Sequence, residues 1–456
     1  MDPSVAYGIA VSSLILDLFF LITLVQGAIR KWVAPGLSLE IEFFRDVLPI
    51  LALIISGQQA HIRRQLGRFT GRAATLFWAY ASAAVFEACS PSLPVFVVLV
   101  GIRTHFAYMP LAFLMPAYLK SWPHGLRKFR QLLVFAVPIF LLAFFQTTQP
   151  VGSVWNQYAD LTMDVATFGA DGADTARATG TFAYITEFAS FAEICALITV
   201  FFMLTTDSKF SRFWYFGILV MALGAIMASG SRGPAAVFGA QVLGLVTLGY
   251  GVRAIPSRHM LPFVAFTLLA AGASMAVLDR QATNFVSRAQ ENADDVDYRV
   301  KFAFFEWPEV IAQYPLGVGL GAGHQAFYRE MAATGTPDLW ETELSRLAFE
   351  FGVGVFVYLA FKVTLIGQLL ARVKVTRSRV GRVMLVTTTM VLIPFLVTGS
   401  VYQPLANIAF WAFVGIGFWV IKLDAATLPA RPAVTLSLKR TATAGHPGSL
   451  VGEGAQ

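Results

Sequence analysis

Long apolar runs separated by short polar connectors dominate the hydrophobic pattern of this chain. Runs such as VAYGIAVSSLILDLFFLITLV and MLPFVAFTLLAAGASMAVL are close to the ~20 residues that a helix needs to cross about 30 Å of hydrocarbon. The pattern predicts an all-α polytopic membrane protein with about twelve transmembrane helices. We expect the spans at residues 6–28, 44–57, 73–90, 94–119, 131–146, 181–205, 213–229, 234–250, 260–278, 345–370, 383–399 and 404–421.

One long polar segment interrupts this pattern between the ninth and tenth expected spans. Within it, the aromatic side chains of VKFAFFEWPEVIAQY predict a helix lying in the membrane interface, and PLGVGLGAG predicts a tight, close-packing turn. This is the only connector with room for a folded subdomain outside the membrane. The expected organisation is spans one to nine in residues 1–278, a loop subdomain with interfacial helices in 279–344, spans ten to twelve in 345–421, and a disordered tail in 422–456.

The charged residues divide between alternate connectors. HIRRQLGRFTGR, KSWPHGLRKFR, GVRAIPSRH and RVKVTRSRVGR carry basic residues and no Asp or Glu, so the positive-inside rule predicts that these four connectors are cytoplasmic. Most acidic residues lie in the other connectors, which are therefore expected to face outward. An even number of spans then predicts that both termini are cytoplasmic and that the long polar segment lies outside.

Composition excludes several classes of protein. The chain is 56% hydrophobic and 13% charged, against roughly 45–50% apolar and 25% charged residues in soluble domains. The net charge of +7 follows from the basic connectors and does not indicate nucleic acid. The two cysteines lie inside apolar runs, and no motif indicates a metal site, a P-loop or a dinucleotide fold, so no cofactor is expected.

The first apolar run lacks a basic region before it and a cleavage site after it, which predicts a retained membrane span.

Arg232 is the strongest candidate for binding a ligand. It lies in ASGSRGPA, an otherwise apolar turn on the predicted outer side, and a guanidinium group holds phosphate oxygens in a bidentate fork. Arg299 and Arg346, in the long polar segment and at its end, could converge with Arg232 on a diphosphate. The alternatives are that Arg232 reaches to lipid headgroups and that Arg299 pairs with neighbouring aspartates.

Acidic residues supply the other candidates. Glu341 and Glu343 lie where the polar segment returns to the membrane, so either could act as general base for a hydroxyl, or both could be acids favoured by a helix start. Arg103 and Glu187 are expected at one depth in the membrane, where charged side chains must face inward or pair. A pair between them would line an acceptor groove or, as we favour, serve as a structural staple.

Four stretches, in order, resemble the superfamily of bacterial O-antigen polymerases and O-antigen ligases. They span residues 177–361 and read RATGTFAYITEFASFAE, ASGSRGPA, YRVKFAFFEWPEVIAQYPLGVGLGAGHQAF and ETELSRLAFEFGVGVFVYLAF. The resemblance implies metal-independent, inverting glycosyl transfer from an undecaprenyl-diphosphate carrier at the periplasmic face of the inner membrane. The paired arginines of the family fall on Arg232 and Arg299. The implied partners are the lipid-linked oligosaccharide, membrane lipid and the flippase, chain-length or export proteins of the same pathway.

One departure from the family pattern favours a polymerase. In the ligases a His followed by Asn precedes the Glu of a Glu-x-Gly motif, and the corresponding positions before Glu350 are Glu341 and Thr342. Glu341 or Glu343 would then have to orient or deprotonate the acceptor hydroxyl. A ligase-type transferase acting on a different acceptor remains an alternative, as does a flippase or transporter of lipid-linked oligosaccharide.

Overall fold

The structure is a computed structural model in which a subset of the residues is described. These are residues 3–56, 72–90, 93–160, 163–168, 175–277, 283, 305–325, 327–328, 340 and 342–426. Arg299 and Glu341, most of the expected loop subdomain and the tail from residue 427 lie outside them.

The described part of the chain is helical, which confirms the predicted all-α class. Nine helical segments in it are long and apolar enough to cross a membrane. They comprise α1 (Pro3–Ala28), α5 (Val95–Phe106) with α6 (Pro110–Tyr118), α7 (Trp122–Thr148), α8 (Ile185–Thr205), α9 (Lys209–Ala228), α10 (Arg232–Gly251), α15 (Glu343–Phe351) with α16 (Val355–Val375), α17 (Arg379–Leu392) and α18 (Pro404–Ala426). The chain is a polytopic membrane protein.

The other three expected spans also form helices, but these are not among the nine. They are α2 (Ser38–Ile55), α4 (Arg72–Ala88) and α11 (Ser257–Val277). The first half of α2 carries four charged residues, and α4 is 17 residues long. Charge therefore sets α2 apart and length sets α4 apart, although the hydrophobic pattern located all three helices.

Polar side chains mark the start of several helices. Ser208 accepts a hydrogen bond from the Ser211 amide at the start of α9, and Thr342 accepts one from the Ser345 amide at the start of α15. Such N-caps satisfy amide groups that have no partner within the helix. At the other end of the chain, α18 continues to Ala426, so residues 422–426, which were expected to belong to the disordered tail, are helical.

Two helices that the sequence predicted as single spans are broken. Residues 107–109 separate α5 from α6, and a short 3₁₀ turn (Gly352–Gly354) separates α15 from α16. Pro110 starts α6, where its missing amide hydrogen costs nothing, and Gly352 adopts a φ of 51°. Breaks at membrane depth are tolerated where the backbone is buried in protein, and both breaks lie against other segments of the chain.

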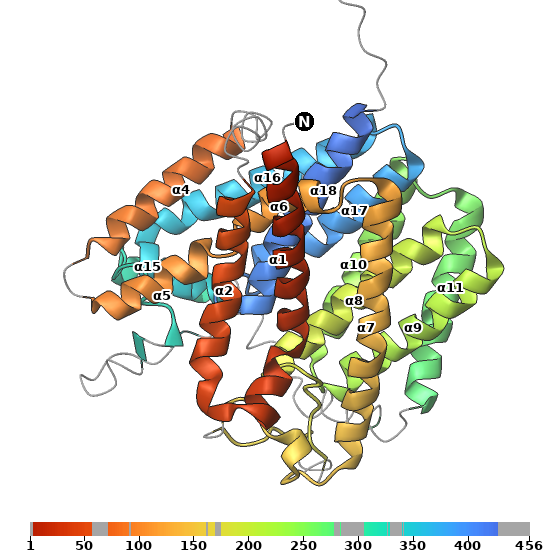
Figure 1. The fold of residues 1–456 in the computed structure, drawn as a ribbon, viewed down its shortest axis with the longest axis horizontal. Coiled ribbons are helices and arrows are strands. Elements are labelled where there is room, and N and C mark those ends of the chain that lie inside the picture. The colour runs from red at the N-terminus through yellow and green to blue at the C-terminus, as the bar shows by residue number, and fades with distance from the viewer. Residues whose placement is uncertain are drawn as a thin grey trace, which may run out of the picture.

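The core divides into two clusters. The larger surrounds α8, which contacts α7, α9, α10, α17 and α18. The smaller includes Tyr80 of α4, Val97 of α5 and Phe349 of α15. In Figure 1, α4, α5 and α15 lie on one side of the upright pair α1 and α2, whereas α9 and α11 lie on the other.

Different loops and chain ends lie at the two ends of the helical bundle. The turn between α1 and α2 and the segment between α7 and α8 lie at the lower end in Figure 1. The N-terminus, the start of α7 and the end of α18 lie at the upper end. The candidate residues described next belong to loops and helix ends, so this arrangement decides which of them can meet.

Candidate functional site

Two of the four stretches quoted above meet in the structure. The loop before α8 contains Arg177, and the turn between α9 and α10 runs from Ser229 to Ser231, directly before Arg232, the first residue of α10. Arg177 Nε donates to the Ser229 carbonyl at 2.8 Å, and Arg177 Nη2 donates to Ser231 Oγ at 3.1 Å. The Ala178 amide also donates to the Ala228 carbonyl at 2.9 Å. This packing brings Arg177 to the turn that carries the half-buried Arg232.

Residues from two other helix ends fix the loop before α8. Gln146, near the end of α7, accepts hydrogen bonds from the amides of Thr179 and Gly180 at 3.1 and 2.8 Å. Lys31 follows α1 in a π-helical turn, and its ammonium group donates to Thr179 Oγ1 at 2.9 Å and to the Gly180 carbonyl at 2.8 Å. Lys31 is 1% exposed. These contacts hold the loop between α1 and α7.

The remaining two stretches also meet each other. The Val318 amide donates to the Phe349 carbonyl at 2.8 Å. Glu350 Oε1 accepts hydrogen bonds from the amides of Gly321 and Gly323 at 3.1 and 3.0 Å. The glycine run is therefore bound along the end of α15, and the carboxylate of Glu350 acts as its anchor.

The glycines in this run are required by close approach of the backbone. Gly321 has a φ of 95°, and a Cβ atom there would collide with the Val97 carbonyl of α5. Gly317 has a φ of 81°, and a Cβ atom there would collide with the Glu350 carbonyl. Only glycine avoids both the steric overlap and the cost of positive φ. This confirms the tight, close-packing turn predicted for PLGVGLGAG.

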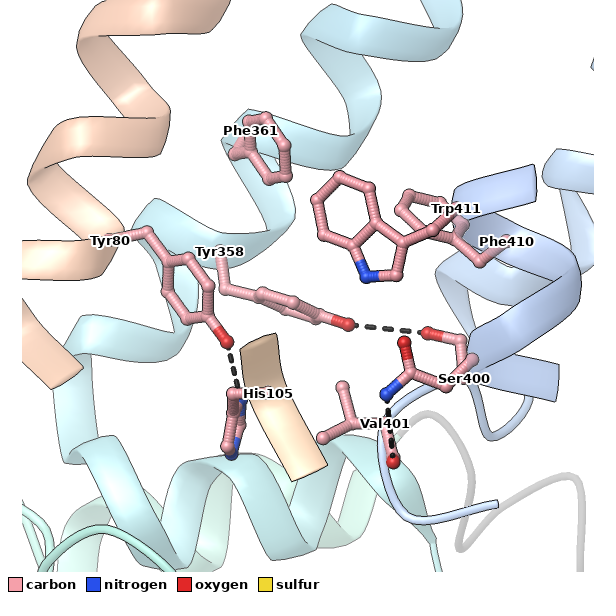
Figure 2. A pocket seen from close by; sticks show the side chains of 9 residues that line it. Tyr80, His105, Tyr358, Phe361, Ser400, Val401, Phe410 and Trp411 are labelled. Atoms are coloured by element: carbon pink, nitrogen blue, oxygen red, sulfur yellow. Dashed lines mark hydrogen bonds between the residues drawn. The ribbon is translucent and has the colours of Figure 1, made fainter. Parts of the chain in front are cut away.

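Glu350 also binds a histidine that the sequence analysis did not select. His105 Nε2 lies 2.7 Å from Glu350 Oε2, both side chains are 0% exposed, and His105 Nδ1 hydrogen-bonds the Tyr80 hydroxyl. The partners are 245 positions apart in the chain, and no local motif joins them. In Figure 2 the Tyr80 hydroxyl points to His105, and the Tyr358 hydroxyl points to Ser400. These four side chains line a cavity of about 10 Å³, room for about one water molecule.

Glu343, one of the two predicted general bases, lies in a buried ion pair. Its Oε2 atom accepts hydrogen bonds from the amides of Ser400 and Val401, and its Oε1 atom lies 3.5 Å from Lys362 Nζ. Lys362 also donates to Ser400 Oγ at 2.5 Å. Both carboxylate oxygens are occupied and the residue is 7% exposed. A role as general base would require this pair to open.

Arg103 binds residues other than the expected Glu187. Its guanidinium group forms ion pairs with Asp46 and, at 3.2 Å, with Glu42. Glu42 also pairs with Arg30 at 2.5 Å, so α2 supplies the carboxylates. The predicted pair between Arg103 and Glu187 is therefore wrong, because the two acids of α2 already satisfy the arginine.

Glu187 occupies a different position, near Arg45 and Lys31. It lies in the first turn of α8 and is 6% exposed. Its Oε2 atom has no hydrogen-bond partner among the described residues, and the carboxylate interacts electrostatically with Arg45 and Lys31. Arg103 and Glu187 thus belong to separate contacts, and a groove lined by both stays a prediction.

Arg346 lies in α15 beside the glycine run. Its Nε atom donates to the Trp340 carbonyl at 2.7 Å, and its guanidinium carbon lies 5.6 Å from the centre of the Tyr402 ring, within the range of a cation–π contact. Burial and the nearby guanidinium groups of Arg103 and Arg346 lower the pKa of His324 to about 4. His324, at the end of the glycine run, is therefore neutral at pH 7.

The predicted diphosphate-binding residues are thus distributed over two regions. Arg232 lies beside the loop before α8, Arg346 lies beside the glycine run, and Arg299 is outside the described residues. Among the described residues no group of three or more His, Cys, Asp or Glu could hold a metal ion. No protein-family model matches the chain, and a search of curated proteins finds no significant match.

Proposed function

We propose that this protein is a polysaccharide polymerase of a bacterial inner membrane. It transfers glycan from an undecaprenyl-diphosphate carrier to a hydroxyl of another lipid-linked repeat unit at the periplasmic face. The observation that carries the proposal is the packing of the loop before α8 on the turn before α10, where Arg177 Nε lies 2.8 Å from the Ser229 carbonyl. Both segments belong to the stretches that resemble the polymerase and ligase superfamily.

The proposed chemistry needs fixed positive charge and a base. The acceptor hydroxyl attacks the anomeric carbon, and the bond from that carbon to the diphosphate breaks. Negative charge then develops on the leaving diphosphate, and guanidinium donors at Arg232 and Arg299 would neutralise it without a metal ion. Glu341 remains the candidate to take the proton from the hydroxyl, and Glu343 could do so only after separation from Lys362.

The same proposal fixes the orientation in the membrane. We assign the lower end of the bundle in Figure 1 to the periplasm, because the acidic segment between α7 and α8 is there. The basic connector before α7 and both ends of the described chain lie at the opposite end, which suits the cytoplasm. In this orientation α2, α4 and α11 complete twelve crossings.

Replacement of the arginines tests the proposal. We expect Arg232→Ala and Arg299→Ala to yield folded, inserted protein that no longer extends the glycan in a strain lacking the wild-type gene. Arg212→Ala is the matched control, because Arg212 binds a backbone carbonyl at the other end of α9 and should support normal polymer. Full-length polymer from both test variants would refute the proposal.

The lipid-linked species in the deletion strain separates the alternatives. A polymerase defect leaves single repeat units on the carrier, whereas a defect in ligation leaves finished polymer on the carrier. A transport defect would leave the lipid-linked unit on the cytoplasmic side of the membrane. Glycan-modifying enzymes added from the periplasmic side could not reach it there.

A further inference from the structure

We propose that Arg177 is a positioning residue for Arg232. Arg177 would set the conformation of the turn before α10 and so direct the Arg232 guanidinium towards the carrier diphosphate. This inference rests on the proposed function, but the contact that carries it lies entirely within the described structure.

The guanidinium group of Arg177 binds both sides of the turn. Its Nε atom donates to the Ser229 carbonyl at 2.8 Å, and its Nη2 atom donates to Ser231 Oγ at 3.1 Å. Ser231 is the N-cap of α10, yet its side chain accepts no hydrogen bond from that helix. Arg177 therefore engages the residue directly before Arg232 and fixes where α10 begins.

The turn is shaped to fit this guanidinium. Gly230, between the two bonded serines, has a φ of 63°, and a Cβ atom there would lie 2.8 Å from Arg177 Nε. The side chain of Arg177 thus packs directly on bare glycine backbone. The Ser231 amide donates to Ser229 Oγ at 3.1 Å, which closes the turn around the same contact.

The other end of Arg177 is anchored to the protein. Its backbone amide donates to the Ala166 carbonyl at 3.0 Å, and the next amide, of Ala178, donates to the Ala228 carbonyl. Further along, Lys31 and Gln146 fix the same loop to α1 and α7. Arg177 consequently links Ser231, the N-cap residue of α10, to a loop that is itself bound to α1 and α7.

A fixed turn matters because preorganised donors stabilise developing charge without reorganising during the reaction. Without Arg177, the Ser229 carbonyl and the Ser231 hydroxyl lose their charged donor, and Gly230 allows the turn to sample other conformations. We then expect weaker diphosphate binding that acts through Arg232. A direct contact between Arg177 and the diphosphate is the competing explanation.

Two measurements on the full-length protein in detergent distinguish these explanations. The first is amide hydrogen exchange in the peptide that contains Ser229 to Gly233. The second is the affinity for undecaprenyl diphosphate, the probe for the carrier. Both are made on Arg177→Gln, Arg177→Lys, Arg232→Gln and the double variant with glutamine at both positions. Arg212→Gln is the matched control, since it removes an arginine that binds the Thr206 carbonyl.

Positioning predicts a specific combination of results. Arg177→Gln should speed exchange in the turn and weaken probe binding, each on the order of tenfold, with a smaller change in Arg177→Lys and none in Arg212→Gln. Arg177→Gln should cause no further loss of binding when Arg232 is already glutamine. Unchanged exchange in Arg177→Gln would overturn this inference, and so would losses of probe binding that simply add in the double variant. Neither result would overturn the proposed function. Normal probe binding by Arg232→Gln would overturn the proposed function as well.

Discussion

His105 and Glu350 join two broken helices at their breaks. The Nε2 and Oε2 atoms lie 2.7 Å apart, and each residue is the penultimate residue of its helix, α5 and α15 respectively. The backbone groups freed by the breaks find partners nearby: the Val353 amide donates to the Pro315 carbonyl at 2.9 Å, and Asn407 Nδ2 donates to the Thr104 carbonyl at 2.5 Å. The pair is therefore part of a satisfied polar network inside an apolar protein.

Removal of the Glu350 carboxylate should be strongly destabilising. Glu350→Ala leaves His105 and the amides of Gly321 and Gly323 without their acceptor, and we expect a loss of about 3–5 kcal/mol. Glu350→Gln keeps one acceptor oxygen and should lose less. Thermal unfolding of the purified protein in detergent measures both, with the exposed Glu309→Ala as control. An equal melting temperature for Glu350→Ala and Glu309→Ala would contradict this assignment.

The close approach of the glycine run to α5 should make Gly321 intolerant of a side chain. Gly321→Ala introduces a Cβ atom against the Val97 carbonyl at a φ of 95°, and we expect a loss of at least about 1–3 kcal/mol. The matched control is Gly239→Ala in α10, where an added Cβ meets open space and should be neutral or stabilising. The difference in melting temperature between the two variants is the measurement. Similar values would show that the glycine run is not packed on α5.

Arg103 should be energetically coupled to Asp46 and not to Glu187. A double-mutant cycle with Arg103→Met and Asp46→Asn should give a coupling energy of about 0.5–3 kcal/mol, because the two side chains form an ion pair. The equivalent cycle with Glu187→Gln is the control and should give additive effects. Stability in detergent provides the free energies. Strong coupling to Glu187 with none to Asp46 would restore the pairing expected from the sequence.

The neutral state of His324 predicts a dependence of stability on pH. The pKa of His324 is about 4 in the folded protein and 6.5 in an unperturbed histidine. Between these values the unfolded chain binds more protons, so the contribution of His324 to stability is complete above pH 6.5 and is lost as the pH falls towards 4. His324→Gln should show a smaller loss of melting temperature over this window than the wild type. Because carboxylates titrate in both proteins, their effect on the two melting temperatures is the same. Parallel curves of melting temperature against pH would therefore contradict the prediction.

The sequence predicted local features well. Apolar run lengths located a helix at each of the twelve expected spans, and the glycine spacing in PLGVGLGAG predicted a close-packing turn. Both signals lie within a short stretch of sequence, although the contacts that require Gly317 and Gly321 come from Glu350 and Val97. The breaks after Phe106 and Phe351 were missed, because mean hydropathy does not distinguish one long helix from two short ones.

The partners of the charged residues could not be obtained in the same way. Arg103 and Glu187 were paired because their expected depths agree, but depth does not specify which helices are neighbours. The structure pairs Arg103 with Asp46 of α2, and it buries Glu343 against Lys362. His105 finds its acidic partner in Glu350, which belongs to a helix that only the fold brings near.

The sequence by itself determined that this chain is an α-helical membrane protein and which segments form its apolar helices, whereas the resemblance of four segments to envelope glycosyltransferases stays a prediction. Hydrophobicity and backbone preference are properties of short stretches, so they can be read without the fold. Only the tertiary structure decided that the four resembling stretches associate in two pairs and that Arg177 contacts the turn carrying Arg232. Those contacts join residues distant along the chain, and the packing of the helices is what sets their separation in space.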